Sequence, residues 1–359
     1  MFKVLIAKLD MGHDNQEKKV VRNSNIELYR CIVMMLIVAH HYMIHSGLLI
    51  ETANCLTSSE SIYLYMFGMW GKIGINCFVL ITGYYMCLSD ISVRKLLKIL
   101  LQVEFYKFFI FIVFHVNDQS LSLNNILFSL LPFTNIDNGF VDCFFIFYLF
   151  IPYLNILVHS MTRKQHILLI ALCLFVFCLW AQLNIFVVRN NYVVWFCVIY
   201  IVAAYIRVYK LDGTLSCCTW GIITLLLVEL AFISIVALLY LGRIWPYCLV
   251  YDCNSILAVA ISVCSFMFFI NLKIKYSKFI NIAGATTFGV LLISDCNWEM
   301  RRWLWSDMCH CVEWFHKNVY LHSVISVIGV YTVCSIIDYF RLRLFEKPMF
   351  ELFKKYNIC

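Results

Sequence analysis

The sequence predicts an all-α, polytopic integral membrane protein with about ten transmembrane helices in a single bundle and both termini in the cytoplasm. Three observations support this prediction. The chain is 63% hydrophobic and only 14% charged, whereas soluble proteins carry roughly 25% charged residues. Its apolar runs last about 18 to 25 residues, the length of a helix that crosses a hydrocarbon core of roughly 30 Å. Lysine and arginine alternate in abundance from loop to loop.

The chain divides into a transmembrane domain, residues 26–340, between two cytoplasmic tails, residues 1–25 and 341–359. The apolar start MFKVLIAKLD is too short for a cleaved signal peptide, so we expect the first span to be retained. The ten predicted spans cover residues 26–46, 62–88, 96–116, 139–158, 166–183, 192–209, 217–240, 254–271, 279–296 and 318–340.

The orientation follows from the basic residues. With the N-terminus inside, 20 of the 28 lysines and arginines fall in inner segments and five in outer segments. Cytoplasmic loops of membrane proteins carry such an excess. The net charge of +7 is explained by this bias, so nucleic acid is not an expected partner. We expect a multi-pass protein of the cytoplasmic membrane, with the lipid bilayer as its surroundings.

The first span, RNSNIELYRCIVMMLIVAHHYMIHSG, holds several ionisable groups. At 100° per residue, Glu27, Arg30, His41 and His45 fall on one helix face, and His40 points about 100° away from His41. Ionisable side chains at membrane depth are costly and usually face a cavity or a partner. We therefore expect this face to line a functional cavity, and we expect a packing role for His40.

Two further spans carry charges. The second, GMWGKIGINCFVLITGYYM, holds Lys72 near its middle and Asn76 one turn later, and both are candidates for lining the cavity. Its glycines permit close helix packing. In the third span, Glu104 and Lys107 are three residues apart, so we expect them to neutralise each other.

A basic cluster, SVRKLLKIL, opens the third span on the cytoplasmic side and contains Arg94, Lys95 and Lys98. The topology bias alone would explain it. Arginine and lysine are also the natural partners of phosphate groups. The cluster is therefore a candidate site for a phosphorylated cytoplasmic ligand.

The 18 cysteines lie mostly in apolar spans, where a free cysteine behaves as a small hydrophobic residue. The stretch Cys309-His310-Cys311 lacks the paired spacing of a zinc site. We expect no metal site and no tightly bound cofactor, and a disulfide among the outer cysteines stays open.

These stretches together resemble the integral-membrane acyltransferases of the acyltransferase 3 family. The family's first span carries an arginine, ten intervening residues and a histidine, as do Arg30 and His41. Its second-span pattern G-x-x-G-[VI]-x-x-F-[FV]-x-[IL]-[ST]-G-[FY] is matched from Gly71 to Tyr84, and its basic motif R-R-x-x-R-I resembles RKLLKI. The opening RNSNIEL and the block SKFINIAGATTFGVLLISD are similar to members that act on capsule and exopolysaccharide.

The chain departs from the family pattern at two places. Many members end the penultimate outward span with Y-L-I-H, where this chain has Leu292, Ile293 and Ser294. Where a tryptophan or tyrosine usually opens the fourth span, this chain has Gly139, Phe140, Val141 and Asp142. Both differences lie near the outer side, so they concern the acceptor more than the donor.

The resemblance implies acyl-CoA, commonly acetyl-CoA, as co-substrate. It implies a hydroxyl of a bacterial cell-surface sugar, or of a lipid-linked glycan, as acceptor. The phosphates of CoA would then meet Arg94, Lys95 and Lys98, and Arg30 would hold the donor or stabilise charge. His41 would act as general base or as a nucleophile that forms an acyl-imidazole, and both mechanisms stay open.

Other functions fit part of the pattern. Intramembrane charges on ten spans also suit a proton-coupled transporter or a polysaccharide flippase. Transporters often show internal repeats and broken helices in matching halves, and neither is visible in the sequence. A sensor-like, non-catalytic member of the same fold is a third alternative.

Overall fold

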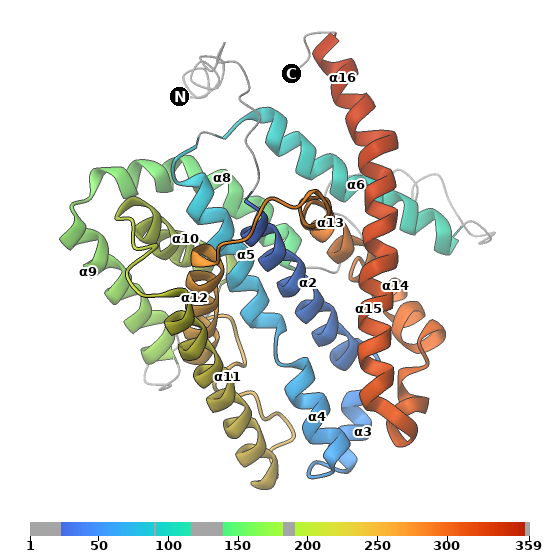
Figure 1. Ribbon diagram of the computed structural model, residues 1–359. Coiled ribbons are helices and arrows are strands. Elements are labelled where there is room, and N and C mark those ends of the chain that lie inside the picture. Colours follow the sequence, from blue (N-terminus) through green and yellow to red (C-terminus); the bar gives the residue numbers. More distant parts are fainter. Residues whose placement is uncertain (1–22, 90, 116–138, 182–190, 356–359) are drawn as a thin grey trace.

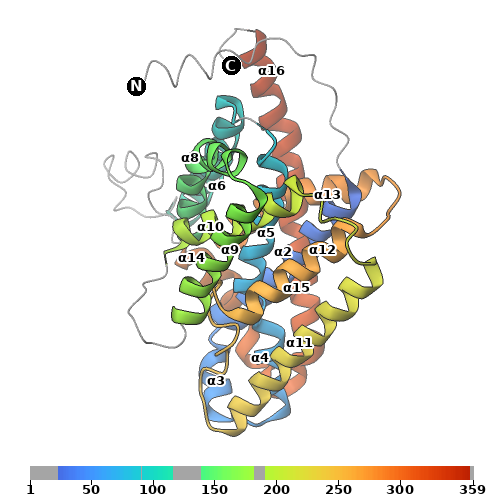
Figure 2. The same ribbon diagram turned by 90° about the vertical axis from the view of Figure 1, so that its left-hand side faces the viewer.

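The computed structural model describes residues 23–89, 91–115, 139–181 and 191–355, and these ranges contain helices and no strands. The all-α prediction is therefore confirmed for this part of the chain. Figures 1 and 2 show one bundle of helices. Most of the N-terminal tail and the last four residues lie outside the described ranges.

A helix lies in each of the ten ranges predicted as spans. The second range contains two helices, because the helix is interrupted by a turn between Gly68 and Gly71. In chain order the elements are α2 (Ser24–His45), α3 (Leu48–Asn54), α4 (Ser59–Gly68), α5 (Gly71–Met86), α6 (Val93–His115), α8 (Gly139–Ser160), α9 (Arg163–Leu174), the π-helical η1 (Phe175–Trp180), α10 (Tyr192–Val208), α11 (Cys217–Tyr240), α12 (Ile256–Asn271), α13 (Lys278–Ser294), α14 (Trp298–Arg302), the π-helical η2 (Trp303–Met308), the 3-10 turn η3 (Cys311–Trp314), α15 (Phe315–Arg341), the π-helical η4 (Leu342–Glu346) and α16 (Lys347–Lys355).

The long helices have the composition of membrane spans. Among the described residues, six helical segments are long and apolar enough to cross a bilayer: Ser24–His45, Ser59–Met86, Gly139–Ser160, Arg163–Trp180, Cys217–Tyr240 and Trp298–Phe353. Three shorter apolar helices are α10, α12 and α13. On α11, Leu225 and Ile233 are 69% and 59% exposed. Large exposed apolar side chains on a long apolar helix are unfavourable in water and suit contact with lipid.

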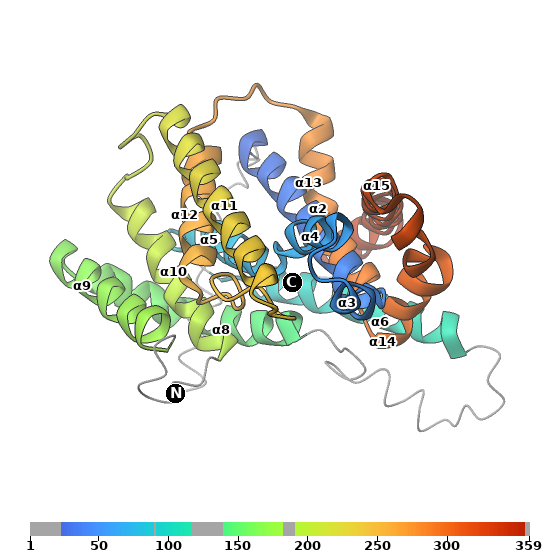
Figure 3. The same ribbon diagram turned by 90° about the horizontal axis from the view of Figure 1, so that it is seen from below.

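Helix α2 lies at the centre of the bundle, where it packs against α4, α5, α12, α13 and α15 (Figure 3). Glycines allow two of these neighbours to come close. A Cβ atom on Gly284 of α13 would lie 3.1 Å from the Cα of Glu27, and one on Gly74 of α5 would lie 2.5 Å from Ile37. Small residues permit such contacts between membrane helices. The expected packing role of the second-span glycines is thus seen at Gly74.

Helix α6 is steeply tilted relative to α15. Figure 1 shows α6 lengthwise as it slants across the upper part of the molecule, and Figure 3 shows it lengthwise again while α15 is seen nearly end-on. The amino end of α6 and all of α16 lie at the upper end in Figure 1, and α3 lies at the lower end with the carboxyl end of α11. On α6, Lys107 Nζ lies 2.5 Å from Glu104 Oε2, which confirms the predicted pair.

Candidate active site

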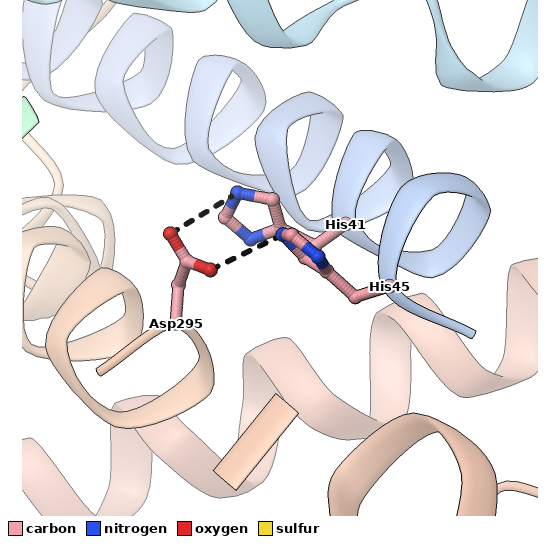
Figure 4. Close-up of side chains that lie close together, drawn as sticks. All are labelled: His41, His45 and Asp295. Carbon is pink, nitrogen blue, oxygen red and sulfur yellow. Dashed lines mark ion pairs between the residues drawn. The ribbon is translucent and has the colours of Figure 1, made fainter. Parts of the chain in front are cut away.

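His41 and His45, one turn apart on α2, converge on Asp295, which follows the last residue of α13 (Figure 4). His41 Nε2 lies 3.5 Å from Asp295 Oδ2, and His45 Nε2 lies 3.4 Å from Oδ1. The side chains of His41 and Asp295 are each 8% exposed. Two residues of the predicted stripe therefore meet a carboxylate that comes from a helix far along the chain.

Arg301 completes this group. Its Nε lies 2.5 Å from Asp295 Oδ1. The side chain of Asn297 accepts a hydrogen bond from the backbone N–H of Met300 and so caps the short helix α14, which carries Arg301 back towards Asp295. A buried carboxylate needs such partners, because an uncompensated charge in a low-dielectric interior is costly.

The position of Asp295 favours one tautomer of His41. A carboxylate only accepts hydrogen bonds, so it favours the neutral imidazole in which Nε2, the nitrogen that faces it, carries the proton and Nδ1 keeps its lone pair. Nδ1 of His41 is buried and has no hydrogen-bond partner among the residues that the structure describes. One nitrogen of His41 thus faces a carboxylate, and the other is buried without a hydrogen-bond partner in the described part of the chain.

A cavity of about 200 Å³ lies beside this group. His41, Asp295 and Arg301 form part of its wall, and Lys72 and Tyr192 form another part. The ammonium group of Lys72 donates a hydrogen bond to the hydroxyl of Tyr192 and lies 4.9 Å from the centre of its ring. The predicted candidates His41 and Lys72 are thus brought to one cavity by α2 and α5.

His40 takes the packing role expected for it, but it also reaches the cavity. Its Nδ1 lies 2.5 Å from the carbonyl oxygen of Gly68, and a Cβ atom on Gly71 would lie 2.4 Å from its ring. His40 nevertheless lines the same cavity as His41. The helix angle alone was therefore wrong as a criterion for separating the two histidines, because the cavity is wide enough to touch both faces of α2.

Asn76 was predicted to line the cavity, and it lines none of the three cavities discussed here. It is fully buried, its amide donates to the carbonyl of Cys253 at 2.7 Å, and its oxygen accepts from Trp195 Nε1 at 2.8 Å. Both ends of the side chain thus tie α5 to its neighbours. A buried amide that is paired at both its donor and its acceptor end holds structure.

Glu27 and Arg30 lie at the other end of α2 and line none of the three cavities discussed here. Glu27 is 5% exposed, lies against α13 and has its Oε1 3.8 Å from Arg30 Nη1. Arg30 Nε is buried without a hydrogen-bond partner in the described part of the chain. Along a helix, Arg30 and His41 are separated by about 16 Å.

A larger pocket of about 830 Å³ lies at the end of the molecule where α6 begins and α16 lies (Figure 1). The predicted cluster of Arg94, Lys95 and Lys98 lines it. Three basic residues from other elements also line it: Lys278 at the start of α13, Arg343 in η4 and Lys347 at the start of α16. Six basic residues therefore face two acidic ones, Glu346 and Glu351.

Ion pairs hold one wall of this basic pocket. Lys98 Nζ lies 2.6 Å from Glu346 Oε1, and Glu346 Oε2 lies 2.6 Å from Arg341 Nη1. Arg341 Nε also lies 2.7 Å from Asp338 Oδ1. Lys98 thus forms an ion pair with the carboxyl-terminal part of the chain, a contact that the excess of basic residues in cytoplasmic loops does not require.

The group of His41, His45 and Asp295 also has the donor set of a metal site, since one ligand atom from each lies within 4.8 Å of the others. We expected no metal from the sequence, where only the Cys309–Cys311 stretch was considered. Arg301 already supplies a positive charge to Oδ1 of Asp295 at 2.5 Å. The arrangement therefore fits two chemistries, a carboxylate-backed base and a metal ligand set.

Sequence reasoning missed Asp295 and Arg301 as members of the site. Asp295 ends a stretch that resembles the family, and Arg301 counts among the few cations predicted on the outer side. Both signals are present in the sequence, but neither shows which side chains of α2 Asp295 and Arg301 contact. The same is true of Lys278, Arg343 and Lys347, which the topology bias alone accounts for.

The family profile of an acyltransferase domain matches residues 23–339. No curated protein and no solved structure matches the chain. The matched range contains His41, Asp295 and Arg301, and it ends at the last turn of α15. A match over most of the chain, with helices that suit a bilayer, leads to one conclusion: the protein is a membrane acyltransferase of the acyltransferase 3 family.

Proposed function

We propose that the protein transfers an acyl group, commonly acetyl, from acyl-CoA in the basic pocket to a hydroxyl of a cell-surface saccharide at the cavity beside His41. The observation that carries this proposal is the carboxylate-backed imidazole of His41 on a cavity wall, with one nitrogen unpartnered. A basic pocket lies at the opposite end of the same bundle. The acceptor is a capsular, exopolysaccharide or lipid-linked sugar in a bacterial cytoplasmic membrane.

The proposed topology has ten spans with both termini in the cytoplasm. Helix α2 then runs outward, so that His41 lies in the outer half of the bilayer and Arg30 near the inner surface. The basic pocket faces the cytoplasm, where acyl-CoA is available. The break between α4 and α5 falls within one span. Non-helical backbone at membrane depth is tolerated where it lies inside protein, and Gly68 and Gly71 pack against α2.

The basic pocket suits the phosphate end of CoA. Its volume of about 830 Å³ is within the range of roughly 300–1,000 Å³ usual for ligand sites. Arg94, Lys278 and Arg343 come from three different elements and provide charge from several sides. Ile282 and Ala285 of α13 line the pocket, whereas Gly284 between them faces Glu27 of α2. The pocket thus reaches the depth of the first turns of α2, from which the acyl arm extends towards His41.

The chemical step uses the unpartnered nitrogen of His41. Nδ1 accepts the proton of the acceptor hydroxyl as the hydroxyl oxygen attacks the thioester carbonyl, and the thiolate of CoA leaves and takes up that proton. Asp295 stabilises the imidazolium that forms and keeps the ring in one tautomer. Arg30 holds the donor near the inner end. In the second mechanism Nδ1 attacks the thioester carbonyl and CoA leaves as the thiolate; the acceptor hydroxyl then attacks the acyl-imidazole, the imidazole leaves, and the proton of the hydroxyl goes to the thiolate.

Transfer of label tests the function directly. Washed membranes that contain the protein are expected to move radiolabel from acetyl-CoA to de-O-acetylated surface polysaccharide purified from the producing cells. We expect this because the proposed donor pocket and the cavity beside His41 belong to the same chain, so no second protein is needed for the transfer. Scintillation counting of the purified glycan measures the transfer, and membranes without the protein are the control. A flippase or transporter would leave the glycan unlabelled, and that result would contradict the proposal.

Loss of charge in the basic pocket is expected to weaken donor binding. The triple replacement Arg94→Gln, Lys278→Gln and Arg343→Gln should raise the KM for acetyl-CoA at least about tenfold, since one charged hydrogen bond contributes roughly 1.5–3 kcal/mol and 1.4 kcal/mol corresponds to tenfold. The KM for acceptor should stay unchanged. Initial rates at varied acetyl-CoA measure the effect.

The matched control for this prediction is the pair Lys273→Gln and Lys275→Gln. These lysines are exposed beside α13 and do not line the basic pocket. They carry the same topology signal but have no part in the proposed site. Equal KM values in the two sets of variants, with normal membrane abundance, would show that the cluster serves orientation alone.

A further inference from the structure

A second cavity adjoins the proposed catalytic cavity and has a different wall. Its volume is about 340 Å³, and it shares His40, Lys72 and Tyr192 with the cavity beside His41. The rest of its wall comes mainly from the segment between α11 and α12, including Trp245, Tyr247, Tyr251 and Asp252. The two cavities are therefore neighbours separated by the Lys72–Tyr192 pair.

The aromatic residues of this segment form a fixed wall. Trp245 and Tyr251 are 44% and 58% exposed, and their rings meet edge to face with centroids 6.3 Å apart. Tyr247 lies behind them, buried, with its ring 5.4 Å from that of Trp245 and its hydroxyl donating to the carbonyl of Tyr65 at 3.1 Å. Tyr65 in turn donates to the carbonyl of Ile244 at 2.9 Å. Two exposed rings thus stand on a buried support.

Polar groups hold this segment in place, and two charged groups line the cavity. The segment is anchored by Asn76, which donates to the carbonyl of Cys253, and by the backbone N–H of Asp252, which donates to Ser255 Oγ at 3.1 Å. Asp252 and Lys72 both line the cavity, so one acidic and one basic group stand in a wall that is otherwise largely aromatic. This also gives Asn76 a role, since its amide holds the segment in place.

A wall of this kind suits a sugar ring. A pyranose has faces of C–H bonds, which pack on aromatic rings, and an edge of hydroxyl groups, which need charged or polar partners. Ligand sites commonly combine an aromatic lining with a few placed polar groups. Exposed tryptophan and tyrosine also settle at membrane surfaces, but that role requires neither a cavity nor polar groups facing it.

We infer that this second cavity is the acceptor subsite and binds a saccharide unit against Trp245 and Tyr251. The inference rests on the proposed acyl transfer. Asp252 and Lys72 accept and donate hydrogen bonds at the hydroxyl edge of the sugar. The unit bound there presents a hydroxyl, its own or that of the adjoining unit, across the Lys72–Tyr192 pair to Nδ1 of His41. The wall selects sugars with an unhindered apolar face.

The test compares acceptor and donor kinetics in single variants. Trp245→Ala and Tyr251→Ala are each expected to raise the KM for de-O-acetylated surface polysaccharide about fivefold to tenfold, as befits loss of an aromatic contact. The KM for acetyl-CoA should not change. Trp245→Phe keeps a ring and should stay within about twofold of the native protein. Trp298→Ala is the control, because Trp298 is 59% exposed and lines none of these cavities.

The outcomes separate the subsite from the function. An unchanged acceptor KM in both Trp245→Ala and Tyr251→Ala, while the native protein labels the glycan, overturns the subsite alone. An equal loss in Trp298→Ala shows that these rings only anchor the protein at the membrane surface. No label transfer by the native protein overturns both proposals. Because Tyr251 is largely exposed, its variant keeps the test decisive if Trp245→Ala reduces membrane abundance.

Discussion

Replacing His41 with alanine is expected to abolish glycan acylation while the protein stays in the membrane at its normal abundance. The replacement removes an imidazole whose Nε2 faces Asp295 and whose Nδ1 has no hydrogen-bond partner among the described residues. General-base catalysis contributes about 10²- to 10⁴-fold, and the loss should appear in kcat. His41→Gln should not restore activity, since an amide can bind the hydroxyl but cannot take its proton.

His40→Ala is the matched control for His41→Ala. The two histidines are adjacent and line the same cavity, but Nδ1 of His40 is already committed to the carbonyl of Gly68. The His40 variant should keep a substantial fraction of the native rate, with some loss of stability because the ring packs on Gly71. The measurement is label on the glycan, normalised to protein in the membrane. An essential His40 beside a dispensable His41 would overturn the assigned base.

Asp295→Asn is expected to lower kcat by at least about 10²-fold with little change in either KM, because the carboxylate acts on the reaction through His41. Asparagine keeps the shape of the side chain but no longer stabilises the imidazolium. The rate measured against pH should also change its profile, which a purely structural role would not produce. Initial rates at saturating donor and acceptor give the comparison.

The Asp295 variant needs a control for Arg301. Asp295→Asn removes the negative charge that lies 2.5 Å from Nε of Arg301, whose side chain is 16% exposed, and loss of one charge from a largely buried pair costs at most about 3–5 kcal/mol of stability. The double variant Asp295→Asn, Arg301→Gln removes both charges and should regain thermal stability without regaining kcat. Recovery of activity together with stability would contradict the positioning role of Asp295.

Metal removal distinguishes the two chemistries that His41, His45 and Asp295 fit. As a carboxylate-backed base, the native protein should keep its rate after treatment with a chelator. If the chelator abolishes the rate and added Zn²⁺ restores it, catalysis requires a bound metal ion. That result would contradict the role of His41 as base. The experiment uses the protein in membranes, so that folding is unchanged.

The sequence by itself determined the helical class and the positions of the helices. A bilayer requires about 20 apolar residues per crossing and internal satisfaction of every backbone hydrogen bond. Hydrophobic runs of that length therefore become helices whatever their neighbours are, and each of the ten predicted ranges contains one. Motif spacing also indicated the family, and the pair Glu104–Lys107 followed from local helical geometry.

Only the tertiary structure decided which side chains meet. Helical periodicity gives the direction of a side chain around its own axis but not the helix that faces it. Asp295 therefore became visible as the partner of His41 and His45 only once α13 was packed on α2. For the same reason Asn76, placed on a cavity by its spacing from Lys72, instead anchors Cys253.

The basic pocket shows the same division. The cluster at the start of α6 was apparent from the sequence, but Lys278, Arg343 and Lys347 join it from segments far along the chain. Each of these residues satisfies the topology bias on its own, so composition cannot separate a topology signal from a ligand contact. The fold places them around one pocket because α13 and the end of α15 pack beside the start of α6, and contacts between distant segments are not encoded in any local pattern.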